Sequence, residues 1–252
     1  MGNSENQNEW FADEEFWNRW FRPELEKREQ EQIDKISSLL EIEKESDILD
    51  LGCGRGRHAR ELAARGHNVT GVDIDEKNIK IAREKAEADE EVLQYNFIKD
   101  DMREFKKEKE FDIILSLFSS FGYFKEEKEN EKVLKNAYES LRSGGKLLID
   151  VKGKEVIAGM FEKRGWHELD DKYLLEKREI QDDWKYIHTK WTFISPQEKN
   201  INEYKSTIRL YSAAELESKL KKIGFSQIEI YGSFEGDPYN EEAERTLVIA
   251  QK

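Results

Sequence analysis

Cysteine, proline and long apolar runs are all scarce in this chain of 252 residues. With Cys53 as its only cysteine, the chain can form no internal disulfide, and no cluster of cysteine and histidine has the spacing of a zinc site. Nowhere do eighteen apolar residues follow one another, and residues 1–9 are polar, without the pattern of a signal peptide. We therefore expect a cytoplasmic protein with no metal and no membrane partner.

Basic residues are also in deficit, with 42 Lys and Arg against 55 Asp and Glu and a net charge of −13. Nucleic acids are bound by clustered Lys and Arg, so this balance argues against a nucleic-acid partner. The deficit is uneven, because residues 1–151 carry 25 basic and 36 acidic residues whereas residues 152–210 carry 12 and 11. The near-neutral stretch leaves room for a small anionic or zwitterionic ligand. Aromatic residues reach 11%, enough for a buried core.

Short apolar runs alternate with amphipathic stretches from residue 47 onward, which predicts an α/β fold with a seven-stranded, mainly parallel sheet. We expect strands at 47–51, 68–74, 94–99, 111–117, 146–151, 227–231 and 246–250, and helices at 57–64, 75–88, 126–141 and 212–223. Asp75 and Ser212 are the expected helix N-caps, and Gly224 is the expected end of the last helix.

Two segments fall outside this alternation. Residues 152–210 contain three extended polar and aromatic runs and are predicted to form an antiparallel three-stranded cap over the substrate site. Residues 1–40 are predicted to form an N-terminal helical lid, with the aromatic side chains of Trp17 and Trp20 closing over the ligand, and simple core packing is the alternative. Residues 41–151 and 211–252 then form the α/β core.

A glycine-rich loop follows the first predicted strand, in the run Asp-Leu-Gly-Cys-Gly-Arg-Gly at 50–56. Glycines there let the backbone turn sharply and approach a ligand closely. Asp73 ends the next strand, where a carboxylate can accept hydrogen bonds from both ribose hydroxyls of a nucleoside. Ordinary turn glycines with a capping Asp are the alternative. Counted from Gly54, the loop also fits the G-x-G-x-x-A variant of the dinucleotide-binding motif, so a nicotinamide cofactor remains an alternative.

Four motifs in order resemble those of class I S-adenosylmethionine-dependent methyltransferases: the run at 50–56, Gly-Val-Asp-Ile-Asp at 71–75, Lys-Asp-Asp-Met at 99–102 and Leu-Arg-Ser-Gly-Gly-Lys at 141–146. The resemblance implies a Rossmann-like fold and S-adenosylmethionine as cofactor. It assigns Asp50, Gly52, Cys53 and Gly54 to the methionine moiety, Asp73 to the ribose, Ile74, Asp101 and Met102 to the adenine, and Leu117 and Phe118 to the sulfonium. Asp100 is the alternative to Asp101.

The sequence identifies the residues of the acceptor site less clearly than those of the cofactor site. The loop at 118–124 has no proline where many methyltransferases of nucleic acids and glutamine carry Asn/Asp-Pro-Pro-Tyr/Phe, which argues against those acceptors. The loop contains three side chains that can form hydrogen bonds with an acceptor: Ser119, Ser120 and Tyr123. Tyr123 is also the candidate general base. For each residue, the alternative is a helix cap or a hydrogen-bonded hydroxyl in the core. Arg209 and Tyr211 end the cap, where Arg209 could pair with a substrate carboxylate.

These expectations favour methyl transfer to a nitrogen or oxygen of a small-molecule acceptor. Three alternatives remain open: an RNA methyltransferase, a nicotinamide-dependent oxidoreductase and a non-catalytic S-adenosylmethionine-binding protein. The sequence indicates neither the acceptor nor the oligomeric state.

Overall fold

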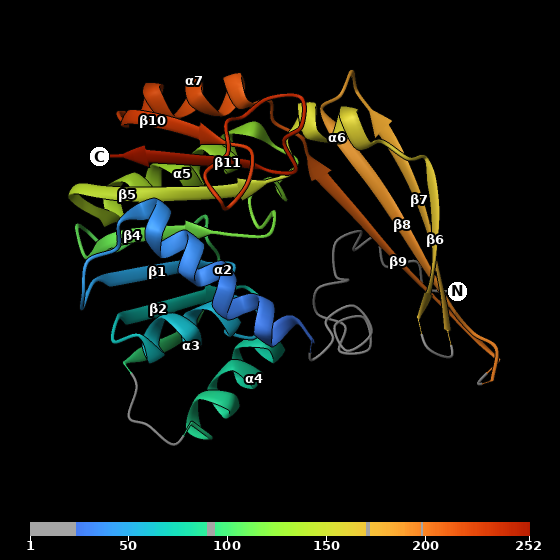
Figure 1. Ribbon diagram of the computed structural model, residues 1–252, viewed down its shortest axis with the longest axis horizontal. Coiled ribbons are helices and arrows are strands. Elements are labelled where there is room, and N and C mark those ends of the chain that lie inside the picture. Colours follow the sequence, from blue (N-terminus) through green and yellow to red (C-terminus); the bar gives the residue numbers. More distant parts are fainter. Residues whose placement is uncertain (1–23, 90–93, 170–171, 198) are drawn as a thin grey trace.

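The computed structural model describes residues 24–89, 94–169, 172–197 and 199–252, and its largest element is a seven-stranded sheet (Figure 1). The strand order is β10–β11–β5–β4–β1–β2–β3. The strands are β1 (Asp47–Leu51), β2 (Asn68–Asp73), β3 (Tyr95–Lys99), β4 (Phe111–Ser116), β5 (Leu141–Val151), β10 (Ser226–Tyr231) and β11 (Thr246–Gln251). β1 to β5 are parallel, and β11 is antiparallel to both of its neighbours. The predicted mainly parallel sheet is confirmed.

Helices cover both faces of this sheet. One face packs against α2 (Glu24–Leu40), α3 (Arg57–Ala64) and α4 (Glu76–Glu87), and the other against α5 (Glu127–Ser140) and α7 (Ala213–Ile223). The two apolar layers follow from the sequence, since the central strands are buried on both faces and each helix has one apolar side. Among the described residues, no helix has both the length and the apolar character needed to span a membrane.

The described part of the predicted N-terminal lid is helix α2. Ile33 and Ile36 are completely buried and Leu40 almost so, all three within the apolar layer that also holds α3. This part of the segment is therefore core. Residues 1–23, with Trp17 and Trp20, lie outside the described residues, and a lid there stays a prediction.

Local capping fixes where two of the helices begin. The Asp75 side chain accepts hydrogen bonds from the backbone N–H groups of Lys77 and Asn78. Ser212 and Glu215 form a reciprocal capping box at the start of α7. Both N-caps are those that the sequence predicts.

Residues 152–210 contain α6 (Lys154–Met160) and a second, antiparallel sheet beside the first (Figure 1). This sheet has four strands, in the order β6 (Arg164–Leu169), β7 (Lys172–Gln181), β8 (Tyr186–Ser195) and β9 (Asn200–Arg209). The prediction of a three-stranded insertion was therefore wrong by one strand. β6 has no apolar alternation, because it is an exposed edge strand paired only with β7.

Candidate active site

The loop that follows β1 is shaped by glycines in a backbone conformation that other residues rarely adopt. Gly52 and Gly54 have φ angles of 79° and 54°. A Cβ on Gly52 would lie 2.8 Å from both Cβ and Oγ of Ser120. The backbone N–H groups of Gly52 and Cys53 donate to the Val72 carbonyl at 2.8 and 3.0 Å, which fixes the loop to β2. The loop is thus a tight turn at the carboxyl end of β1, packed against Ser120. We call the turn at 52–54 the glycine cradle.

Asp73, the last residue of β2, lies beside this cradle. Its two carboxylate oxygens accept hydrogen bonds from the backbone N–H groups of Gly54 and Asp75, both at 2.9 Å. Burial raises the pKa of Asp73, and the two backbone hydrogen bonds oppose that rise. Ile74 follows with 48% of its surface exposed. The structure therefore brings Asp73 to the glycine loop, as the sequence spacing predicts, and leaves an apolar side chain open next to it.

Asp50 is buried beneath the same loop, and one of its carboxylate oxygens lacks a partner. Its Oδ2 has no hydrogen bond within the described part of the chain. Burial raises the pKa of Asp50 to about 7, a rise that Arg57 opposes and the charge of Asp73 strengthens. Buried carboxylates without partners are costly, so this oxygen marks a place where a cationic ligand group would complete the site.

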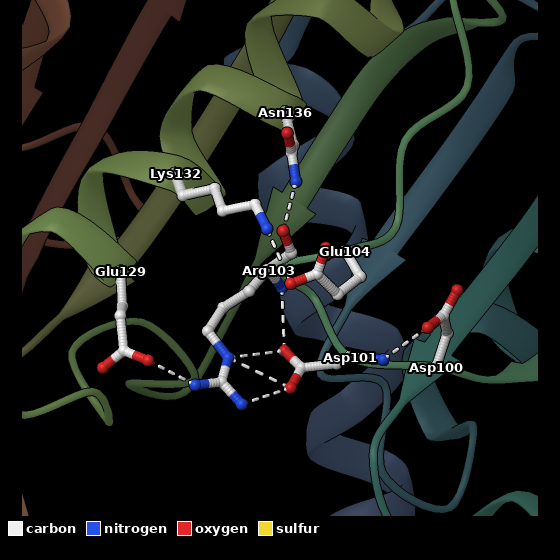
Figure 2. A network of polar contacts seen from close by, with 7 residues as sticks. All are labelled: Asp100, Asp101, Arg103, Glu104, Glu129, Lys132 and Asn136. Carbon is white, nitrogen blue, oxygen red and sulfur yellow. Dashed lines mark hydrogen bonds and ion pairs between the residues drawn. The ribbon is translucent and has the colours of Figure 1, made fainter.

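The predicted adenine residues lie in the turn after β3. Both carboxylate oxygens of Asp101 face the guanidinium of Arg103, at 3.0 Å from Nε, and Glu129 accepts from the Nη1 of Arg103 at 2.5 Å (Figure 2). Burial favours protonation of Asp101, but the hydrogen bonds from Arg103 hold its pKa below the ordinary value. Asp100 accepts the backbone N–H of Asp101 at 2.8 Å through one oxygen only. Met102 packs toward the glycine loop, with its Cε 3.6 Å from the position of a Cβ on Gly52. Both candidate carboxylates therefore lie in this turn, and Arg103 orients that of Asp101 through both of its oxygens.

The loop after β4 has a strained backbone held by Asp150. Phe118 and Ser119 have φ angles of 54° and 59°, values that non-glycine residues adopt at a cost. The Phe118 N–H donates to Oδ2 of Asp150 at 2.7 Å, and the Ser119 N–H donates to the Asp150 carbonyl at 2.9 Å. Ser120 donates its hydroxyl to the carbonyl of the buried Leu117 at 2.8 Å. These bonds fix the four residues next to the glycine loop.

The Phe118 ring is 39% exposed and has cationic and aromatic neighbours. The guanidinium carbons of Arg57 and Arg245 lie 4.1 and 5.1 Å from its centroid, and the His58 ring stacks on it at 5.2 Å. Burial, together with Arg57, lowers the pKa of His58 well below its ordinary value, so the imidazole is neutral. The ring that is predicted to lie beside the sulfonium is therefore partly exposed and has Arg57, Arg245 and His58 as neighbours.

Tyr123, the predicted general base, retains its proton. Burial raises the pKa of its phenol well above the ordinary value, and the charge of Asp73 adds to the rise. A neutral phenol donates a hydrogen bond readily but removes a proton poorly, so the structure favours a donor role over a base.

Arg209 and Tyr211 direct their polar groups to a carboxylate on α5. Arg209 forms an ion pair with Glu127 at 2.5 Å, and the Tyr211 hydroxyl donates to Glu127 at 3.2 Å. Tyr211 is buried, and its ring centroid lies 5.3 Å from that of Phe121. Both predicted substrate residues therefore take part in an internal network that joins the cap to the core.

Sequence reasoning missed three charged residues beside the β4 loop: Asp150, Lys152 and Arg245. Asp150 is completely buried and binds the guanidinium of Arg245. The sequence contains one signal for this pair. Asp150 is a charged residue near the end of the apolar run 147–151, and a buried charge requires a partner.

The chain is similar in sequence and in fold to known methyltransferases. Residues 48–145 match a family model described as a methyltransferase domain. A provisionally named methyltransferase of Bacillus subtilis strain 168 is 28% identical over 210 residues, which are 81% of this chain and 83% of that protein. A crystal structure of an S-adenosylmethionine-dependent methyltransferase from Clostridium acetobutylicum has the same fold, with a TM-score of 0.77 at 17% identity over 89% of this chain and 91% of that chain.

Two further relatives match part of the chain only. The dTDP-3-amino-3,4,6-trideoxy-alpha-D-glucopyranose N,N-dimethyltransferase of Streptomyces venezuelae is 29% identical over 105 residues, 42% of each protein. A ubiquinone biosynthesis O-methyltransferase of Rickettsia canadensis is 38% identical over 85 residues, 34% of this chain and 35% of that protein. These matches cover less than half of either relative.

Proposed function

We propose that the chain is a class I S-adenosylmethionine-dependent methyltransferase, as its match to a methyltransferase domain supports, and that it transfers a methyl group to a nitrogen or oxygen of a small-molecule acceptor held between the core and the cap. When bound, S-adenosylmethionine supplies a methyl group on a positively charged sulfur. The observation that carries the proposal is the buried Oδ2 of Asp50 beneath the glycine loop, which has no hydrogen-bond partner among the described residues.

The residues around this cradle suit each part of the cofactor. Asp50 offers a buried acceptor to the ammonium of the methionine moiety, and Asp73 offers carboxylate lone pairs to ribose hydroxyls. Ile74 provides an exposed apolar surface for the adenine ring. Among the described residues, the proposed set is Asp50, Gly52, Cys53, Gly54, Asp73, Ile74, Asp101, Met102, Leu117 and Phe118; Trp17 and Trp20 complete it outside them.

On the acceptor side, we propose that Ser119, Ser120 and Tyr123 line the site. Tyr123 serves there as a hydrogen-bond donor that orients the acceptor, because its phenol stays protonated. Methyl transfer needs an in-line nucleophile and exclusion of water more than it needs covalent catalysis. The cap formed by residues 152–210 would exclude water from this side.

The acceptor atom is supported only by partial relatives. One is named as an N,N-dimethyltransferase of an amino sugar nucleotide and another as an O-methyltransferase of ubiquinone biosynthesis. Both names refer to small molecules, which favours an amine or a hydroxyl on a small acceptor over an RNA.

Calorimetry with S-adenosylhomocysteine tests the proposal. We expect the wild-type chain to bind it and Asp73→Ala to weaken binding at least tenfold. Asp89→Ala is the matched control, since Asp89 pairs with Arg60 away from the cradle, and it should leave the affinity unchanged. An absence of binding, or binding of NADH instead, would reject the proposal. Binding without turnover on a broad panel of amines and hydroxyl compounds would leave a non-catalytic binding protein.

A further inference from the structure

Lys152 and Arg245 lie next to the end of the β5–β11 ladder on the cap side, where β5 ends and β11 begins. The antiparallel register pairs Val151 with Thr246, so the next opposed positions are Lys152 and Arg245. Opposed residues in such a ladder point to the same face, and like charges there are destabilising. Asp150, on the same face, binds Arg245 at 2.5 and 2.6 Å. That ion pair neutralises Arg245 and leaves Lys152 as the excess positive charge.

The ammonium group of Lys152 has no carboxylate partner among the described residues. Its one contact is with the Sδ of Met160 at 3.7 Å, a weak acceptor. Burial lowers the pKa of Lys152, and Arg245 and Arg178 lower it further, while Asp150 and Glu244 act in the opposite direction. Keeping a half-buried ammonium near two guanidinium groups costs free energy, which the charges of Asp150 and Glu244 offset only in part.

Arg178 brings a third cation from the cap side. It lies on β7, where it donates to the buried carboxylate of Glu176 and to the carbonyl of Glu162. Its charge is near enough to affect Lys152. Arg178 on β7, Arg245 just before β11 and Lys152 just after β5 thus lie close enough for their charges to interact. The carboxylates of Asp150 and Glu176 each bind one of the two arginines, and Lys152 again remains unpaired.

From this arrangement we infer that Lys152, together with the Nη1 group of Arg245, binds an anionic group of the acceptor, either a carboxylate or a phosphate. The inference rests on the proposed function, since the same site would hold the acceptor. Nη1 of Arg245 makes no hydrogen bond within the described part of the chain, whereas Nε and Nη2 are bound to Asp150. The anion would complete a site that is otherwise short of one negative charge.

The position suits an acceptor at the predicted site. The Lys152 backbone N–H donates to the Ser119 hydroxyl at 3.4 Å, and the Arg245 guanidinium lies over the exposed Phe118 ring. An anion bound by Lys152 therefore lies beside the loop after β4. Holding an acceptor at its anionic end restricts how its nitrogen or oxygen approaches the methyl donor.

Titration of the protein saturated with S-adenosylhomocysteine tests this inference, with inorganic phosphate and malonate as separate probes at constant ionic strength. We expect the wild-type chain to bind at least one probe, and Lys152→Gln to weaken that binding at least tenfold. Lys152→Arg, which keeps the charge, should stay within about threefold of wild type. Lys154→Gln is the matched control, because Lys154 is already paired with Glu215 at 2.8 Å, and it should bind the probe as the wild type does.

The outcomes separate the possible sources of the anion. Binding of phosphate alone supports a phosphorylated acceptor, binding of malonate alone supports a carboxylic acid, and binding of both supports the site without separating them. Binding of neither probe, or equal binding by the wild type and Lys152→Gln, overturns the inference. S-adenosylhomocysteine affinity, measured first on each variant, should be unchanged, and an absence of that binding in the wild type would instead reject the proposed function.

Discussion

The carboxylate of Asp150 binds the guanidinium of Arg245 across 95 residues of sequence, at 2.5 and 2.6 Å. The same carboxylate accepts the backbone N–H of Phe118 at 2.7 Å. Phe118 and Ser119 have positive φ angles, each worth about 1–3 kcal/mol of strain. The ion pair therefore provides the fixed partner that holds a strained loop at the mouth of the site.

Removing Asp150 should destabilise the protein. We expect Asp150→Ala to lower the free energy of unfolding by about 3–5 kcal/mol, because Arg245 would be left without its partner in a largely buried place. Urea denaturation measures the change. Asp34→Ala is the control, since Asp34 is exposed and pairs with Arg65 at the surface, and it should cost at most about 1 kcal/mol. Equal effects of the two substitutions would mean that the buried pair has no special structural role.

The glycine cradle should tolerate no side chain. We expect Gly52→Ala to weaken S-adenosylhomocysteine binding at least tenfold, because the new Cβ would lie 2.8 Å from Ser120 and the φ of 79° is strained for alanine. Gly66→Ala is a close control, with a φ of 89° and nothing within 4 Å of its Cβ. It should lower stability by about 1 kcal/mol through backbone strain and leave the affinity unchanged. Calorimetry at one temperature distinguishes them, and a normal affinity for Gly52→Ala would contradict the proposed cradle.

Asp50 should make cofactor binding depend on pH. Its pKa is raised to about 7 in the free protein, so the carboxylate that would pair with the cofactor's ammonium is mostly protonated below that pH. We expect the affinity for S-adenosylhomocysteine to rise from pH 5.5 to about 7 and then level off. Asp50→Asn should bind more weakly and show a flat profile over the same range. A wild-type profile parallel to that of Asp50→Asn would rule out ionisation of Asp50 as the cause.

Ionisation of Asp50, which should strengthen cofactor binding, should lower the stability of the protein without cofactor. The pKa of Asp50 is higher in the folded chain than in the unfolded chain, so the folded chain holds this proton more tightly. The protonated carboxyl therefore contributes its full stability at a pH below the ordinary pKa of Asp. This contribution is lost as the pH rises to about 7. Asp50→Asn should therefore melt at a higher temperature than the wild type at pH 8, and the difference should shrink toward pH 5. Calorimetric melting of both chains without cofactor measures it, and a constant difference across the range would contradict the linkage.

The two carboxylates after β3 can be separated by substitution. We expect Asp101→Asn to weaken S-adenosylhomocysteine binding at least tenfold and Asp100→Asn to change it less than threefold. Arg103 keeps Asp101 ionised and in one orientation, which suits an acceptor for the adenine amino group. The reverse ranking would assign the adenine to Asp100, whose second carboxylate oxygen makes no hydrogen bond within the described chain.

Much of the core could be predicted from the sequence because its signals are local. Strands buried on both faces appear as apolar runs in the sequence. The helix N-caps Asp75 and Ser212 depend on residues two or three positions away. β6 could not be predicted in this way, since its strand conformation comes from pairing with β7 and not from its own pattern. The cap was therefore predicted with one strand too few.

The sequence by itself determined the order of strands and helices in the α/β core, the glycine loop and the position of Asp73 beside it. Each of these depends on backbone conformation and on spacing along a single strand–loop–helix unit, and short-range sterics control both. Only the tertiary structure decided which charges are paired: Arg209 with Glu127, Asp150 with Arg245, and Lys152 with no carboxylate among the described residues. Sheet register brings those side chains together from distant parts of the chain, and electrostatic pairing depends on distance in space, which the order of residues does not specify.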